Sequence, residues 1–283
     1  MELHQSNLVL RVVPDVGGRL MSIQISGHEI CFIHPELQGK VFDGSEAHWN
    51  ALRSDGSFPL WGGGKTWVAP ESAWPHGAPH RDLDSLPWTT EKTWIHASSM
   101  GVVVLSPVCR DSGLQIRRTI TLPAGTTDWT VDHELVNRGD RSITCGVWDV
   151  LMLRRPAQVR LPSVTLHEVS ALPNKPSVTH LAQQGILDSY ESGVLLRCEA
   201  PLEFKCGFVG VGGRLDVSFD DIPVGYSRFS EQQPHAAYAH GHPLEVFNAP
   251  VLAYFEVETH SPVQVLHPSE CLRYSIHECV SLR

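Results

Sequence analysis

Several features that define other protein classes are missing from this chain of 283 residues. It contains no run of 18 apolar residues, so no segment is predicted to span a membrane. The first residues, MELHQSNLVLRVVPD, lack the basic region, apolar stretch and cleavage site of a secretory signal. No basic run offsets the formal charge of −9, and acidic surfaces repel phosphate backbones. We therefore expect neither a membrane nor a nucleic-acid partner.

Cysteine and glycine patterns exclude two further classes of site. The seven cysteines are odd in number, and no pair has C-x-x-C spacing. Most lie in apolar strand-like runs such as GVVVLSPVC, so we expect reduced, buried thiols in a cytoplasmic protein. The glycine run at 62–64 lacks the spacing and the strand-to-helix context of a phosphate loop. Nothing in the sequence indicates a cofactor.

What the sequence does contain is alternation of apolar and polar residues from end to end. In LQIRRTITL (114–122) and DWTVDHELVN (128–137) the apolar residues fall on one strand face, and SITCGVWDVLML (142–153) is nearly all apolar. Short strands punctuated by glycine, proline, asparagine and aspartate predict an all-β antiparallel sandwich. Helices are expected only in SEAHWNALR (45–53) and near HLAQQGILDSY (180–190). No linker or repeat stands out, so we predict one domain, 1–283.

Residues 44–96 differ from the rest because they hold six of the chain's eight tryptophans and lose regular alternation. Long irregular segments inside a compact domain are usually functional or disordered, and so many tryptophans argue against disorder. We therefore expect a binding site in this segment. The alternative is a tryptophan-rich loop that closes one end of the sandwich.

Four segments, in order, resemble the galactose mutarotase-like superfamily, which includes the aldose 1-epimerases. They are PDVGGRLMSIQISGHEICFIHPEL, FPLWGGGKTWVAPESAWP, TLPAGTTDWTVDHELVNRGDRSITCGVW and VLAYFEVETHSPVQVLHPSECLRYSIHECV. The second resembles a subgroup with a Gly-Gly, Trp, Ala-Pro-Glu segment. The resemblance implies an antiparallel supersandwich whose open concave face binds a small-molecule sugar. In the epimerases a glutamate near the C-terminus is the general base, and a central histidine protonates the ring oxygen.

The chain departs from the epimerases at both family histidines. Trp61 stands before Gly62-Gly63 where one histidine would be, and Trp148 and Asp149 stand near the place of the other. Glu258 matches the family glutamate. The resemblance therefore favours a sugar-acting epimerase or isomerase with an atypical acid. Two alternatives stay open: a non-catalytic carbohydrate-binding or sensor protein, and a lyase or hydrolase on the same scaffold.

Glu256 and Glu258 lie two residues apart, hence on the same strand face, and are candidates for a catalytic acid and base. The alternative is the solvated face of an edge strand. Candidate substrate-binding residues share the glycine-rich segment, where aromatic faces and charged groups suit a sugar. They are Lys65, Trp67, Glu71 and Trp74.

Other candidates have competing structural explanations. Arg19 could anchor an anionic sugar or form a structural ion pair. Asp149, inside an apolar strand, could face the site or pair with an arginine such as Arg154. His133, on an apolar face, is expected to be a structural core-edge histidine. A replacement proton donor would come from the histidines, which titrate near neutral pH; the candidates are His76, His80, His240 and His242. The histidine clusters lack the convergent ligand pattern of a metal site, so no metal is expected.

Overall fold

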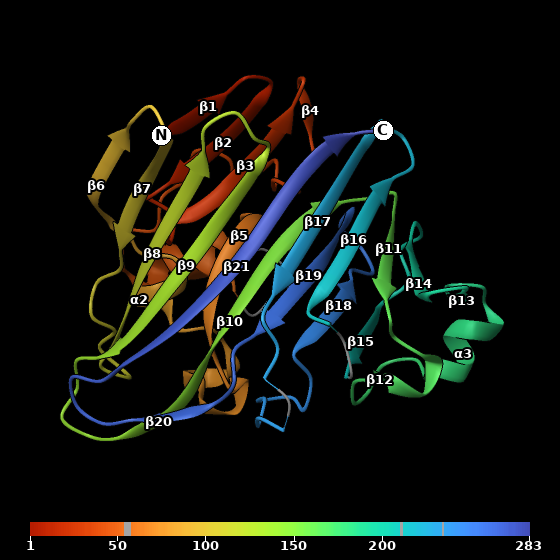
Figure 1. The fold of residues 1–283 in the computed structure, drawn as a ribbon. Helices are drawn as coiled ribbons and strands as arrows, with labels where there is room; N and C mark the ends of the chain where they lie inside the picture. The colour runs from red at the N-terminus through yellow and green to blue at the C-terminus, as the bar shows by residue number, and fades with distance from the viewer. Residues whose placement is uncertain (54–57, 210–211, 234) are drawn as a thin grey trace.

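The computed structural model describes residues 1–53, 58–209, 212–233 and 235–283, apart from the side chain of His76. Two large antiparallel sheets face each other and enclose the main core, which confirms the predicted all-β sandwich (Figure 1). The first sheet has the strand order β1 (Glu2–Gln5), β2 (Leu8–Val13), β3 (Arg19–Ile25), β5 (Gly63–Ala69), β10 (Ile143–Arg154), β19 (Tyr254–His260), β18 (Leu244–Asn248), β15 (Phe204–Phe208) and β12 (Val169–Ala171), with β4 (His28–Glu29) beside β3 and β20 (Gln264–Leu266) beside β10.

The second sheet is built largely from hairpin-connected neighbours. Its order is β13 (Leu187–Tyr190), β14 (Gly193–Cys198), β11 (Ala157–Pro162), β16 (Arg214–Phe219), β17 (Val224–Ser230), β21 (Cys271–Leu282), β9 (Asp128–Asn137), β8 (Leu114–Pro123), β7 (Ser99–Leu105) and β6 (Thr89–Ile95). In Figure 1, β6 and β7 lie at one end of the molecule and β13 and β14 at the other.

Alternation places the core as the sequence predicts. Every second residue of β8 and β9 is buried, and β10 is buried on both faces from Cys145 to Leu153. A strand covered on both sides cannot alternate, which is why its sequence is nearly all apolar.

The helices are few and short: α1 (Glu46–Leu52), α2 (Arg81–Asp84) and α3 (Val178–Gln183), with 3₁₀ turns at Glu71–Ala73, Pro75–Gly77 and Leu166–Glu168. Ser45 caps α1 by accepting from the backbone N–H of His48. The helix expected near 180–190 ends at Gln183, and strand β13 follows it. Among the described residues, no helix has the length and apolar character needed to cross a membrane.

One expectation for the tryptophan-rich segment is wrong. Residues 44–96 are not irregular throughout, because β5 lies between β3 and β10 in the first sheet. It begins with two glycines and is buried on both faces, so its sequence shows no alternation. Trp49, Trp61 and Trp88 are core residues, whereas Trp67 and Trp74 lie in a pocket described below. Residues 54–57 of this segment fall outside the described part.

Candidate functional site

A pocket of about 800 Å³ lies on the face of the first sheet that points away from the second sheet. It is lined by Phe58, Leu60, Trp67, Glu71, Trp74, Trp148, Ala171, Leu172, Pro173, Asn174, Lys175, Glu203, Lys205, His240, His242, Phe247, Tyr254 and Glu256. These residues come from six neighbouring strands and the loops beside them. The mixture of aromatic rings and charged groups is typical of a small-molecule site.

Strand β19 supplies the polar floor of this pocket. Phe255 and Val257 belong to the main core, so Glu256, Glu258 and His260 point to the opposite face. The predicted common face of the two glutamates is therefore confirmed. The predicted alternative of a solvated edge strand is wrong, because β19 lies between β10 and β18 and all seven of its residues are buried.

Strand register brings the pocket residues together. On β10, Trp148 lies opposite Trp67 of β5 on one side and His260 of β19 on the other. One strand further, Glu258 pairs in register with Glu245 of β18. Residues distant in sequence thus form rows across one sheet face.

Three tryptophans form an aromatic wall. The ring of Trp67 lies 5.0 Å from that of Trp148 and 5.2 Å from that of Trp74, both edge to face. Trp74 stacks on Trp148 at 5.4 Å with an interplanar angle of 18°. Trp74 also donates from Nε1 to the carbonyl of Val68 at 2.6 Å, which fixes its orientation. The wall offers flat apolar surface against which a sugar ring can pack.

Lys65 and Glu256 form a buried ion pair at the pocket floor. Lys65 Nζ lies 3.1 Å from Glu256 Oε1 and 4.0 Å from the centroid of the Trp67 ring. Burial lowers the pKa of Lys65, and the charge of Glu256 opposes that effect. Glu256 lines the pocket, with 9% of its side chain exposed, so it is the carboxylate of this pair that a ligand can reach.

Glu258 lies behind the pocket surface and is fully buried. Its Oε2 accepts from Trp148 Nε1 at 2.7 Å and from Lys205 Nζ at 2.9 Å, while Oε1 has no partner among the described residues. Burial, with the charges of Glu245 and Glu256, raises the pKa of Glu258 to about 7 despite the opposing charge of Lys205.

Glu245 is the third carboxylate of this face. It pairs with Lys205 at 2.9 Å and with His240 Nδ1 at 3.0 Å. Burial favours a raised pKa, but the hydrogen bond with His240, the nearby imidazoles of His242 and His260 and the charge of Lys205 outweigh burial and lower the pKa of Glu245. Burial lowers the pKa of Lys205, whereas the charges of Glu258 and Glu245 raise it. The carboxylates have the larger effect, so the pKa of Lys205 is raised overall.

Arg19 is not brought to the pocket. It is buried and pairs with Asp84 at 2.9 Å, and it donates to the carbonyl of Gly62 at 3.1 Å. The same Asp84 oxygen accepts from Trp67 Nε1 at 2.7 Å. Arg19 therefore supports the aromatic wall through Asp84 instead of lining the site.

Asp149 lies on the opposite face of β10, between the two sheets. It pairs with Arg228 at 2.9 Å and with His133 Nε2 at 3.0 Å. The predicted pairing of Asp149 with an arginine is confirmed, but Arg154, the arginine suggested, is wrong because it pairs with Asp221. Burial raises the pKa of Asp149, but Arg228 and His133 outweigh burial and lower that pKa to about 2. This geometry also matches the structural role expected of His133.

The remaining candidates divide between the pocket and other places. Glu71 and His240 line the pocket, and so does His242. His80 is buried at a separate pocket of about 230 Å³. His76 belongs to the turn Pro75–Gly77 beside Trp74, and its side chain lies outside the described part.

Two site residues were missed although the sequence carries a signal for them. Lys205 stands between Phe204 and Cys206, and Glu245 stands between Leu244 and Val246. A lone charge in an apolar strand is costly unless paired, so each of these two positions predicts a buried ion pair.

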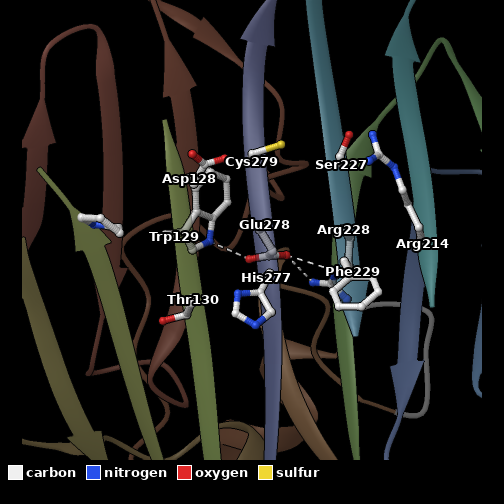
Figure 2. A pocket seen from close by; sticks show the side chains of 11 residues that line it. Asp128, Trp129, Thr130, Arg214, Ser227, Arg228, Phe229, His277, Glu278 and Cys279 are labelled. Carbon is white, nitrogen blue, oxygen red and sulfur yellow. Dashed lines mark hydrogen bonds and ion pairs between the residues drawn. The ribbon is translucent and has the colours of Figure 1, made fainter. Parts of the chain in front are cut away.

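A smaller pocket of about 290 Å³ lies on the second sheet. Figure 2 shows its central carboxylate, Glu278, bonded to Trp129 and Arg228. The distances are 2.6 Å and 2.7 Å, and Tyr226 donates to the same carboxylate. Because Trp129, Arg228 and Tyr226 already bond the Glu278 carboxylate, this carboxylate is less available to a ligand. The pocket on the first sheet is therefore the better candidate for the functional site.

Comparison with solved structures supports the fold. A proposed mutarotase from Salmonella typhimurium has a TM-score of 0.65 at 10% identity, over 100% of this chain and 90% of that one. Galactose mutarotase-like proteins from Lactobacillus casei and Clostridium acetobutylicum have TM-scores of 0.64 and 0.60 at 7% and 11% identity. They cover 99% and 100% of this chain, and 99% and 95% of their own lengths. No family model and no curated protein matches the sequence. The chain has the galactose mutarotase-like fold.

Proposed function

We propose that this protein is a sugar-acting enzyme of the mutarotase type, which moves protons at the anomeric centre of a sugar bound in the 800 Å³ pocket. The observation that carries the proposal is that the three-tryptophan wall and the reachable carboxylate of Glu256 line one pocket. A sugar presents apolar ring faces and hydroxyl groups, and this pocket offers a partner for each.

Glu256 is proposed as the general base that takes the proton of the anomeric hydroxyl. Ring opening must also deliver a proton to the ring oxygen, so a second group is needed. His242 is proposed for that role because its imidazole lines the same pocket. Glu258 is proposed to hold Trp148 and Lys205 in position, since both donate to its Oε2 and it has no exposed surface.

The charge balance of the pocket favours a neutral sugar. Its two lining lysines are both paired, Lys175 with Glu203 at 2.7 Å and Lys205 with Glu245 at 2.9 Å. Glu71 adds a further carboxylate to the wall. A phosphate or uronate group would therefore find no uncompensated cation among the described lining residues.

A non-catalytic carbohydrate-binding protein is the second candidate. It is favoured by the Lys65–Glu256 ion pair, because Glu256 Oε1 already accepts from the ammonium group and only one carboxylate oxygen is left for a substrate proton. The two candidates differ in turnover, not in binding.

Ligand-detected NMR and anomeric exchange spectroscopy against neutral aldoses, uronates and phosphosugars test the proposal. The expected result is accelerated exchange for a neutral aldose. Glu256→Gln should slow this exchange by about 10²–10⁴-fold while binding persists. Glu91→Gln on the edge strand β6 is the matched control and should leave exchange unchanged. Binding without exchange in the wild type would favour the second candidate, and no binding at all would contradict both.

A further inference from the structure

Three histidines converge on one buried carboxylate at the border of the pocket. Nδ1 of His240 lies 3.0 Å from Glu245 Oε1, and Nε2 of His260 lies 3.4 Å from Glu245 Oε2. Nδ1 of His242 lies 3.7 Å from Glu245 Oε1. Glu245 lies in β18 and His260 ends β19, while His240 and His242 belong to the loop before β18. The side chains of all four residues therefore gather around the Glu245 carboxylate.

The separations of 3.0 Å for His240 and 3.4 Å for His260 fit ligands of a single transition-metal ion. Nitrogen and oxygen donors bind such an ion at about 2.0–2.2 Å, which places them roughly 2.9–3.6 Å apart in tetrahedral or octahedral geometry. The donor atoms of His240, Glu245 and His260 all lie within 4.8 Å of one another. Among the described residues, only the imidazole of His240 is hydrogen-bonded to Glu245, so hydrogen bonding alone does not account for the cluster.

The histidine nitrogens lack the partners that a hydrogen-bond network would supply. His260 is 1% exposed, and neither of its ring nitrogens has a hydrogen-bond partner among the described residues. Nδ1 of His242 and Nε2 of His240 are also buried without one. A buried imidazole with both nitrogens unsatisfied is costly, and an ion bound at Nε2 of His260 would satisfy one of the two.

We propose that His240, Glu245 and His260 bind a divalent transition-metal ion. Imidazole and carboxylate donors suit zinc, cobalt or nickel better than magnesium or calcium, which take oxygen ligands. Three protein ligands leave a coordination position open toward the pocket that His240 and His242 line. The binding of an ion does not depend on the proposed sugar chemistry.

Lys205 competes with the ion for Glu245. Its ammonium group lies 2.9 Å from Glu245 Oε2 and 2.9 Å from Glu258 Oε2. This ammonium group offsets part of the negative charge that Glu245 would present to a cation. Removing the ammonium group should therefore strengthen metal binding, whereas removing a histidine should weaken it.

The test is titration of the purified full-length protein with Co²⁺, followed by visible absorption, and with Zn²⁺, followed by calorimetry. We expect one ion per chain at this site. His240→Ala, in a partly exposed loop, should weaken affinity at least 10–100-fold, the loss seen when only an outer partner is removed. His260→Ala should do the same, and Lys205→Met should tighten binding.

His80→Ala is the matched control, because His80, Cys109 and Asp111 form the other donor cluster found among the described residues. This variant should leave the assigned ion in place. Loss of binding in His80→Ala with retention in His240→Ala would overturn the proposal, and so would absence of stoichiometric binding in the wild type. Circular dichroism of every variant separates loss of a ligand from loss of the fold.

Discussion

Trp148 joins three parts of the pocket through one side chain. Its Nε1 donates to Glu258 at 2.7 Å, and its ring stacks on Trp74 at 5.4 Å and on His260 at 5.1 Å. Lys205 Nζ lies 4.8 Å from the centroid of the same ring. Trp148 thus holds the aromatic wall and a buried carboxylate together.

Trp148→Phe tests the value of the indole N–H. The phenyl ring preserves most of the stacking, but Glu258 loses one of its two donors. Leaving part of a buried carboxylate unsatisfied should lower the free energy of unfolding by about 1–3 kcal/mol. Urea denaturation measures this change. Trp94→Phe on β6 is the control, since its Nε1 bonds only Ser99 at 3.3 Å, and an equal loss there would contradict the argument.

At the scale of elements, charged side chains connect the two sheets across the core. Arg228 of β17 pairs with Asp149 of β10 at 2.9 Å and with Glu278 of β21 at 2.7 Å. Arg118 of β8 donates to the carbonyl of Gly18 at 2.8 Å. The alternation in β8 predicts which face Arg118 occupies, but no local pattern identifies its partner on the opposite sheet. Such pairings depend on how the sheets stack.

Asp149→Asn should destabilise the protein by about 3–5 kcal/mol, because it leaves the buried Arg228 with one fewer counter-charge. The pKa of Asp149 is lowered from 3.8 to about 2, so the native state favours its charged form. This contribution is complete above about pH 4 and is lost as pH falls toward 2, and it amounts to roughly 2 kcal/mol. Denaturation of wild type and variant at several pH values should show their difference shrinking toward pH 2. A constant difference would contradict the assignment.

Gly207 of strand β15 has no side chain, and the ring of His242 lies in the space that a side chain would take. A Cβ placed on Gly207 would lie 2.3 Å from the ring of His242, so the ring packs directly against the strand. Gly207→Ala should displace His242 with little change in the free energy of unfolding, since the ring belongs to a loop side chain. If His242 is the proposed acid, a shift of about 1 Å should slow anomeric exchange by about 10²-fold. Gly225→Ala on β17, whose added Cβ would lie 3.2 Å from Ser281 Oγ and 3.8 Å from the Arg283 side chain, should leave exchange unchanged.

At the scale of the whole molecule, the sequence predicts the layers better than the site. Alternation identifies the sandwich and the shared face of Glu256 and Glu258. The pocket, however, requires β5, β10, β19, β18 and β15 to be neighbours, although Lys65 and Glu256 are 191 residues apart. Strand order across a sheet is set by stacking and crossover connections, which leave no local pattern. The apolar neighbours of Lys205 and Glu245 predict that each is buried and paired, but not that the two meet in this pocket.

The charge of the whole molecule also bears on its ligand. The net charge is −9, and the lysines that line the pocket are already paired with carboxylates. Anionic sugars should therefore bind at least about tenfold more weakly than the matching neutral aldose, a difference of about 1.4 kcal/mol. Raising salt from 50 to 500 mM should narrow this gap by screening the repulsion, and should change the neutral sugar's affinity less than about twofold. Titration calorimetry with a neutral aldose and its 6-phosphate measures both effects. Tighter binding of the phosphate, lost in Lys175→Met, would show that a cation is available in the pocket and would contradict the neutral substrate class.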